Sequence, residues 1–185
     1  MRIIAGTARG RAIEAPPGLD TRPTLARVKE ALFGSIQFDL PDSRVLDLFS
    51  GSGALGLEAA SRGARLVILN DYDRNCAALI KKNAEKTQLT DRVTVWQYDY
   101  QEAIRRAKAQ SLLFDIALID APYKAGMGEQ AARLLFSEGL MAPEGIVMLE
   151  HARNLPPQPA PELYEVVWTR NYGDCSLSKL RGIDR

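Results

Sequence analysis

From residue 44 onward, short runs of apolar and β-branched residues alternate with segments that look helical. The runs are apolar at nearly every position, which is typical of strands covered on both faces of a sheet. We expect such strands at 44–49, 65–70, 92–97, 114–120 and 145–150. Between them, we expect helices near 54–62, 74–87, 100–110 and 127–138. Strand–helix alternation of this kind predicts a parallel α/β sheet with right-handed crossovers.

The two ends of the chain depart from this alternation. Residues 1–20 hold short extended runs broken by glycines, which predicts a hairpin-like arm. A helix that packs on the sheet should follow, because apolar residues three and four apart form one stripe: Leu25, Val28, Leu32 and Ile36. After a proline-rich loop at 156–161, segments 163–172 and 175–181 look like a final antiparallel pair. We therefore predict a Rossmann-like α/β domain over residues 21–185, with a mostly parallel, doubly wound sheet.

Composition restricts the class of protein without identifying a partner. The chain has 185 residues, of which 46% are apolar and 25% charged, as expected for one soluble globular domain. No apolar run approaches the roughly 20 residues of a membrane span, and the start "MRIIAGTARGR" lacks the apolar core of a signal peptide. Cys76 and Cys175 are too few and too distant for a disulfide framework or a metal cluster. We expect a cytoplasmic monomer that uses no metal and binds no membrane.

The net charge is only +1, but the arm is basic. Residues 1–13 contain Arg2, Arg9 and Arg11 and no acid, and Arg22 follows. These four arginines are candidates to contact the phosphates of a ligand. A mobile, solvated N-terminus explains the same charges, and the sequence leaves both interpretations open.

A glycine-rich segment, "DLFSGSGALG", follows the first predicted strand. Gly51, Gly53 and Gly56 match G-x-G-x-x-G, and Asp71 lies 20 positions after Gly51, where the second strand ends. In the dinucleotide-binding fingerprint, such glycines let the backbone approach the ligand and the acid binds ribose hydroxyls. The glycine pattern alone is weak, but together with its strand, its helix and Asp71 it favours a nucleoside-type cofactor.

The identity of that cofactor depends on Asp47, four residues before Gly51. A carboxylate this close to a pyrophosphate would be repelled, whereas S-adenosylmethionine carries a cationic amino group and a sulfonium. It also offers a ribose to Asp71 and an adenine to Asp99, after the third strand. We therefore expect S-adenosylmethionine to be bound by Asp47, Phe49, Gly51, Ser52, Gly53, Asp71, Asp99 and Asp120.

The stretch "LIDAPY" ends the fourth predicted strand on Asp120, followed by Ala121, Pro122 and Tyr123. Asp and Pro also favour ordinary turns, but ligands of open α/β sheets bind at this edge. The stretch resembles the signature of amino-methyltransferases, which is Asp or Asn, Pro, Pro and an aromatic residue. The resemblance implies that Asp120 and the carbonyl of residue 121 accept hydrogen bonds from the target amino group, while Tyr123 stacks on the base. Ala121 replaces the usual proline, which puts the rate in doubt more than the reaction type.

Further segments narrow the resemblance: "RIIAG", "TRPT", "RVLDLFSGSGALGLEAASRGA", "DAPY" and "YGDCSLSKLR". Together they resemble the bacterial small-subunit ribosomal RNA guanine-N2 methyltransferases. The resemblance implies a class I methyltransferase fold and a substrate that is one guanine of 16S rRNA in an assembling small subunit. The catalytic residues would be Asp120, Ala121, Pro122 and Tyr123.

Other functions remain open at this point. An N-methyltransferase acting on adenine or on protein glutamine would use the same chemistry, although such enzymes usually carry an added recognition domain. An NAD-dependent oxidoreductase would need a catalytic acid, and the single histidine, His151, is expected to be structural or solvent-facing. Neither cysteine has a setting suited to covalent catalysis on a pyrimidine. A non-catalytic RNA-binding module is the third alternative.

Overall fold

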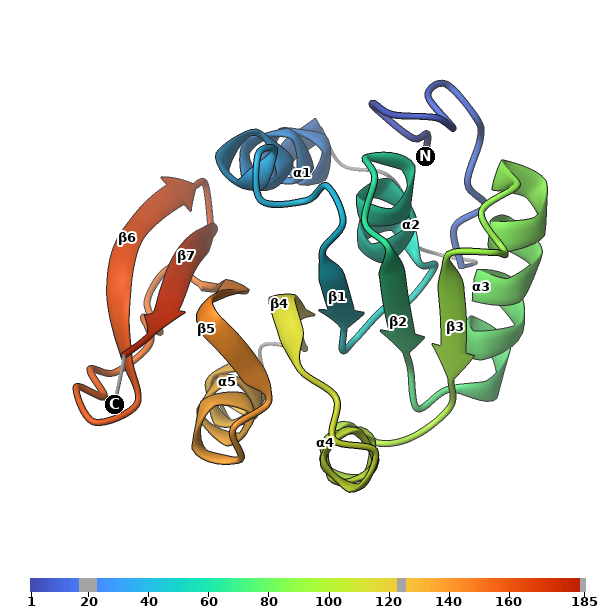
Figure 1. Ribbon diagram of the computed structural model, residues 1–185. Coiled ribbons are helices and arrows are strands. Elements are labelled where there is room, and N and C mark those ends of the chain that lie inside the picture. The colour runs from blue at the N-terminus through green and yellow to red at the C-terminus, as the bar shows by residue number, and fades with distance from the viewer. Residues whose placement is uncertain (17–22, 123–125, 184–185) are drawn as a thin grey trace.

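The computed structural model describes residues 1–16, 23–122 and 126–183, and these residues form one seven-stranded sheet flanked by helices (Figure 1). The strands are β1 (Arg44–Asp47), β2 (Leu66–Asn70), β3 (Val93–Trp96), β4 (Phe114–Asp120), β5 (Met141–Ala152), β6 (Tyr164–Tyr172) and β7 (Cys175–Gly182). The helices are α1 (Pro23–Ile36), α2 (Ala54–Ser61), α3 (Arg74–Thr87), α4 (Tyr100–Ala109) and α5 (Met127–Ser137). Among the described helices, none is long and apolar enough to cross a membrane.

The sheet has the order β3-β2-β1-β4-β5-β7-β6. Strands β1 to β5 pair in parallel, and β7 pairs antiparallel with both β5 and β6. The predicted fold class is therefore confirmed, including the antiparallel C-terminal pair. The order reverses at β1, between β2 and β4, and in open α/β sheets ligands bind at the carboxyl ends of strands beside such a reversal.

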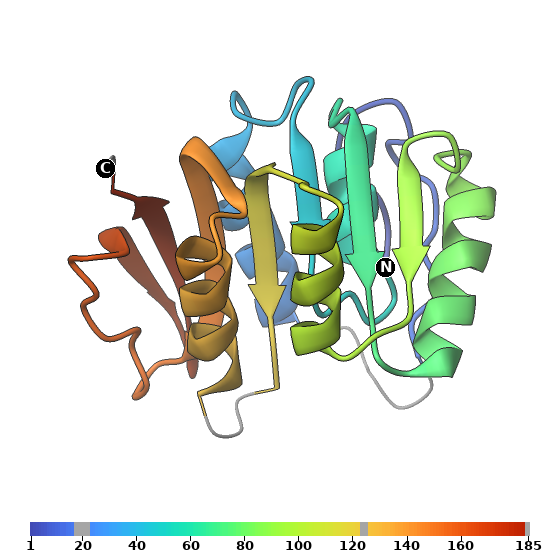
Figure 2. The ribbon, with the colours of Figure 1, turned by 60° about the horizontal axis from the view of Figure 1, so that its bottom comes forward.

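Apolar residues cover both faces of the sheet, as the near-continuous apolar strands require. Helices α1, α2 and α3 contribute to one buried cluster, and α4 and α5 to the other. Figure 2 shows α4 and α5 in front of the sheet, with α1 and α2 behind it. The predicted stripe on α1 is buried at Val28, Leu32 and Ile36.

One strand is longer than predicted. Strand β5 begins at Met141 and its pairing with β4 shifts in register between Phe114 and Ile116. Glu144 adopts a positive φ of 61° beside this irregularity, next to Pro143 and Gly145. Because these residues interrupt the apolar run, the prediction placed the start of the strand at residue 145, four residues too late.

The N-terminal arm is folded against the domain. Arg2 and Ala12 form an antiparallel bridge, and Ile3, Ala8 and Ile13 are buried in the core that α1, α2 and α3 share. The interpretation of residues 1–14 as a mobile, solvated tail is therefore wrong.

Glu58 of α2 anchors the arm. Its carboxylate is fully buried and accepts hydrogen bonds from the backbone amides of Ile4 (2.8 Å) and Ala5 (3.0 Å). The same group forms ion pairs with Lys29 (3.0 Å) and Arg62 (2.8 Å). The sequence analysis did not identify this residue, although a lone acid in the apolar run "ALGLEAAS" was a visible signal.

The arm also approaches α2 very closely at Gly6. Its φ is 85°, and a Cβ at this position would lie 1.8 Å from the carbonyl oxygen of Ser61. Any side chain here would therefore push the arm away from α2.

Candidate active site

The glycine-rich segment forms a tight loop where β1 ends. Gly51 and Gly53 have φ values of 55° and 82°, which favour glycine. The carboxylate of Asp71 accepts hydrogen bonds from the amide of Gly51 (2.8 Å) and from that of Asp73 (2.9 Å). Asp71 therefore holds the loop in place at the end of β2, and a carboxylate has lone pairs for further donors. Its contact with a ribose stays a prediction.

Asp47 lies beneath this loop and is fully buried. Its Oδ2 accepts a hydrogen bond from the amide of Gly56 (2.8 Å), while its Oδ1 has no hydrogen-bond partner in the described part of the chain. Burial raises the pKa of Asp47 to about 7; the charge of Asp71 adds to this, and the Gly56 amide opposes it. A Cβ on Gly56 would lie 3.0 Å from Asp47 Oδ2 and 2.6 Å from Leu69 Cδ2, so any side chain here would force Leu69 to shift.

The ends of β1 and β3 are joined by Asn70, which the sequence analysis missed. Its buried amide donates to the carbonyls of Leu48 (3.1 Å) and Tyr98 (2.9 Å) and accepts from the amide of Tyr98 (3.2 Å). A polar residue closing an apolar strand was the available signal. Asp99 follows Tyr98 in the chain and is exposed. It caps α4 by accepting a hydrogen bond from the amide of Glu102 (2.9 Å).

Phe49 lies just before the glycine loop, and Ser52 lies within it, between Gly51 and Gly53. The Phe49 ring packs against that of Tyr100, with centroids 5.6 Å apart. Ser52 is buried, and its carbonyl accepts from the side-chain amide of Asn83 (2.9 Å). Asn83 also exchanges hydrogen bonds with the backbone of Glu14, both 3.0 Å long, and so connects the arm with the loop.

Asp120 is the last residue of β4 and lies on the same edge of the sheet. The residue is exposed at the end of the strand. Desolvation by the surrounding protein raises the pKa of its carboxyl group to about 8, and the negative charges of Glu150 and Asp47 act in the same direction. Ala121 is buried and Pro122 exposed. The predicted site residues Tyr123 and Arg22 lie outside the described residues.

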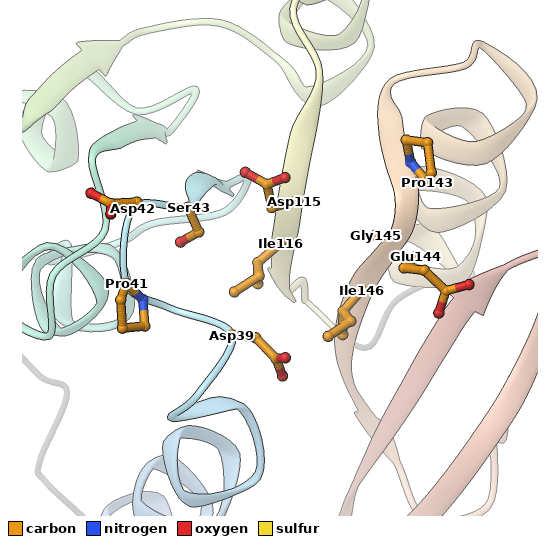
Figure 3. A pocket seen from close by; sticks show the side chains of 10 residues that line it. All are labelled: Asp39, Pro41, Asp42, Ser43, Asp115, Ile116, Pro143, Glu144, Gly145 and Ile146. Carbon is orange, nitrogen blue, oxygen red and sulfur yellow. The ribbon is translucent and has the colours of Figure 1, made fainter.

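A cavity of about 180 Å³ adjoins this strand end and is lined by Ala121, Pro122, Leu149, Glu150 and His151, among others. A larger cavity of about 280 Å³ opens at the amino edge of the sheet (Figure 3). Four acids surround it: Asp39, Asp42, Asp115 and Glu144. Like charges repel, so this second cavity is unsuited to phosphates, and it lies away from the glycine loop. The carboxyl edge is therefore the candidate site.

His151 is a structural side chain. It is buried, its Nε2 lies 2.8 Å from the hydroxyl of Ser178, and its Nδ1 lies 2.9 Å from the carbonyl oxygen of Ala152. These contacts support the structural interpretation of His151 over the solvent-facing one.

The arginines of the arm differ in their surroundings. Arg9 is exposed, as is Arg2, which donates to the carbonyl of Gly10 (2.9 Å). Arg11 is half-buried and donates to the carbonyl of Thr87, at the C-terminal end of α3. Arg2 and Arg9 therefore present charge to the solvent, while Arg11 also holds the arm.

The strand order, the glycine loop after β1 and the acid after β2 define the fold of the S-adenosylmethionine-dependent methyltransferases. An RNA methyltransferase from Salinibacter ruber, solved in complex with S-adenosyl-L-homocysteine, shares this fold with a TM-score of 0.64. Its sequence identity is 16%, and the match covers 90% of this chain and 95% of that one.

A family model described as "Conserved hypothetical protein 95" matches residues 1–181. "Ribosomal RNA small subunit methyltransferase D" of Escherichia coli (strain K12) is 33% identical over 162 residues, which are 86% of this chain and 80% of the relative. The protein of the same name from Haemophilus influenzae is 32% identical over 157 residues, or 84% and 81% of the two chains. The structure of Escherichia coli yhhF is 31% identical with a TM-score of 0.85, covering 100% of this chain and 99% of that one. The chain therefore belongs to the family of the ribosomal RNA small subunit methyltransferase D, as its sequence resemblance suggested.

Proposed function

We propose that this protein transfers a methyl group from S-adenosylmethionine to the exocyclic N2 of a guanine in 16S rRNA, in an assembling small subunit. The observation that carries the proposal is the position of Asp120 and the Ala121 carbonyl at the strand end beside the glycine loop. The names of the relatives support a ribosomal RNA substrate. We also propose that the protein works as a cytoplasmic monomer.

The residues present suit this cofactor. Asp47 Oδ1 is a buried acceptor that no described group satisfies, and a nearby cationic group would stabilise its ionised form. The loop glycines let a ligand approach the backbone closely. Asp71 would hold ribose hydroxyls, and Asp99 would accept from the adenine amino group. When bound, S-adenosylmethionine supplies an electrophilic methyl group, and the protein's own residues prepare the nucleophile.

Asp120 prepares that nucleophile by accepting hydrogen bonds. The exocyclic amine of guanine is a poor nucleophile, because its lone pair is delocalised into the ring. Acceptance of its two N–H groups by Asp120 and the Ala121 carbonyl favours a pyramidal nitrogen and stabilises the positive charge that develops during attack. The raised pKa of Asp120 belongs to the ligand-free site. A cationic ligand nearby lowers this pKa and favours the carboxylate that the chemistry requires.

The test combines rRNA nucleoside analysis with binding. Mass spectrometry of 16S rRNA from a strain that lacks the gene should show the loss of one N2-methylguanosine, restored by the wild-type gene but not by Asp120→Ala. In single-turnover assays Asp120→Ala should keep less than about a tenth of the wild-type rate, with its calorimetric affinity for S-adenosylhomocysteine within a few-fold of wild type. A methyl group on another atom, or preferential binding of NADH, would contradict the proposal.

Tyr123 provides a second test of the same site. If stacking is its role, Tyr123→Ala should be strongly impaired and Tyr123→Phe should keep most of the activity. A Phe variant as inactive as the Ala variant would assign the role to the hydroxyl group instead.

A further inference from the structure

A second carboxylate lies beside Asp120. Glu150 of β5 is the register partner of Asp120 in the parallel pair β4–β5. Neighbouring strands are about 4.8 Å apart and paired residues project to the same face, so the two side chains are neighbours. Asp47 is on this face too, since its register partner Leu118 precedes Asp120 by two positions.

Glu150 is a buried acid close to a second acid. The residue is only 8% exposed, and its negative charge is one cause of the raised pKa of Asp120. Two carboxylates held together repel each other, and such pairs gather at functional sites. Glu150 also lines the cavity beside Ala121 and Pro122. Glu150 therefore lies next to Asp120, at the strand end where we propose that the base binds.

The two carboxylates present hydrogen-bond acceptors side by side. The matching edge of guanine presents two adjacent donors, the N1–H and the N2 amino group. Adenine presents one amino donor beside the lone pair of its N1, which a carboxylate would repel. A pair of acceptors thus matches guanine and opposes adenine.

We infer that Glu150 is a specificity-determining residue that accepts the N1–H of guanine while Asp120 accepts from the N2 amino group. The inference rests on the proposed function and adds how the site distinguishes guanine from other purines with an amino group. Sites built to bond a particular donor discriminate strongly against analogues that lack it.

The test uses synthetic 16S rRNA, assembled with small-subunit proteins, that carries either guanine or 2-aminopurine at the position mapped by mass spectrometry. 2-Aminopurine keeps the N2 amino group, but its N1 has a lone pair in place of the N–H. Loss of one charge-assisted hydrogen bond should lower kcat/KM for 2-aminopurine about 10- to 150-fold in the wild-type protein. In Glu150→Gln, the side-chain amide can donate to that N1. The preference for guanine should then shrink to within about threefold, or reverse.

Two further variants keep the test specific. Glu129→Gln changes another acid that lines the same cavity and is paired with Arg133. This variant should keep the wild-type ratio of kcat/KM for guanine to kcat/KM for 2-aminopurine. Glu150→Asp should lower activity on guanine without recovering activity on 2-aminopurine. The fluorescence of 2-aminopurine reports binding independently of turnover, and it should show tighter binding by Glu150→Gln than by wild type.

The possible results distinguish the inference about Glu150 from the proposed function. Suppose that the wild-type protein methylates guanine N2, and that a folded Glu150→Gln variant keeps the wild-type ratio of kcat/KM for guanine to kcat/KM for 2-aminopurine. This result would overturn the inference and leave the proposed function standing. An equal change of the ratio in Glu129→Gln would also overturn it, because general charge would then explain the effect. No N2 methylation by the wild-type protein would overturn the proposed function, and the inference with it.

Discussion

Replacing Glu58 with alanine should destabilise the protein more than any ordinary surface change. The carboxylate is fully buried and is shared by the amides of Ile4 and Ala5 and by the cations of Lys29 and Arg62. Removing one partner of a buried ion pair costs about 3–5 kcal/mol. For a domain of this size, 1 kcal/mol shifts the Tm by about 2–4 °C. Glu58→Ala should therefore lower the Tm by about 6–20 °C.

Scanning calorimetry measures this shift, and hydrogen exchange locates it. The amides of Ile4 and Ala5 should lose protection in Glu58→Ala, because their acceptor is gone. Glu102→Ala is the matched control: Glu102 is paired with Arg106 on the surface of α4, where such pairs contribute about 0–1 kcal/mol. A Tm loss below about 3 °C, or full protection of both amides, would refute the reasoning.

The same carboxylate sets a pH dependence. Burial alone would raise the pKa of Glu58, but Lys29, the Ile4 amide and Arg62 oppose it, and the net pKa lies below the ordinary value of 4.5. A carboxylate with a lowered folded pKa adds stability above its unfolded pKa, and that stability is lost as the pH falls through the folded value. The stability difference between wild type and Glu58→Ala should thus be full at neutral pH and shrink below about pH 4.5.

Three other predictions concern ligands. Asp71→Ala should weaken S-adenosylmethionine binding by about one to two orders of magnitude, because charge-assisted hydrogen bonds contribute roughly 1.5–3 kcal/mol; an unchanged calorimetric Kd would reject the ribose contact. The free Asp47 has a pKa of about 7 and a cationic ligand favours its ionised form, so affinity for S-adenosylmethionine should rise as the pH passes through that value and then level off. Asp47→Asn should flatten the rise, and an unaltered pH profile in that variant would assign it to another group. Arg9→Ala should weaken RNA binding and reduce the slope of log affinity against log salt by roughly 0.7–0.9. Arg11→Ala should mainly lower the Tm, because Arg11 donates to the Thr87 carbonyl, and a salt slope equally reduced in both variants would show that Arg11 contacts RNA as well.

The features that could be predicted from the sequence depend on the pattern of residues within short segments of the chain. Continuous apolar runs marked the buried strands, and spacing marked the helix faces. Asp47, Asp71 and Asp120 were correctly placed at one edge of the sheet, because parallel strands bring their carboxyl ends together. Their roles stay predictions.

The features that were missed depend on contacts between distant segments. Glu58 is separated from Ile4 by 54 positions, and Asn70 from Tyr98 by 28. The residues around Glu58 and Asn70 do not indicate which groups these side chains bind. Each bonds to the backbone of a distant segment, which comes near only when the sheet and helices have formed. The bond between the Gly51 amide and the Asp71 carboxylate, 20 positions apart, was missed for the same reason.

Asn83 connects the arm and the glycine loop through hydrogen bonds. Its side-chain amide bonds both to the backbone of Glu14 in the arm and to the Ser52 carbonyl in the loop. A ligand that orders one side of such a bridge lowers the entropy cost of ordering the other. Thermodynamic reciprocity then requires that a cofactor which tightens RNA binding is itself held more tightly, by the same factor, once RNA is bound. The two substrates would assist each other's binding through the protein in addition to their contact at the reacting methyl group, and each would be released more readily after the other one leaves.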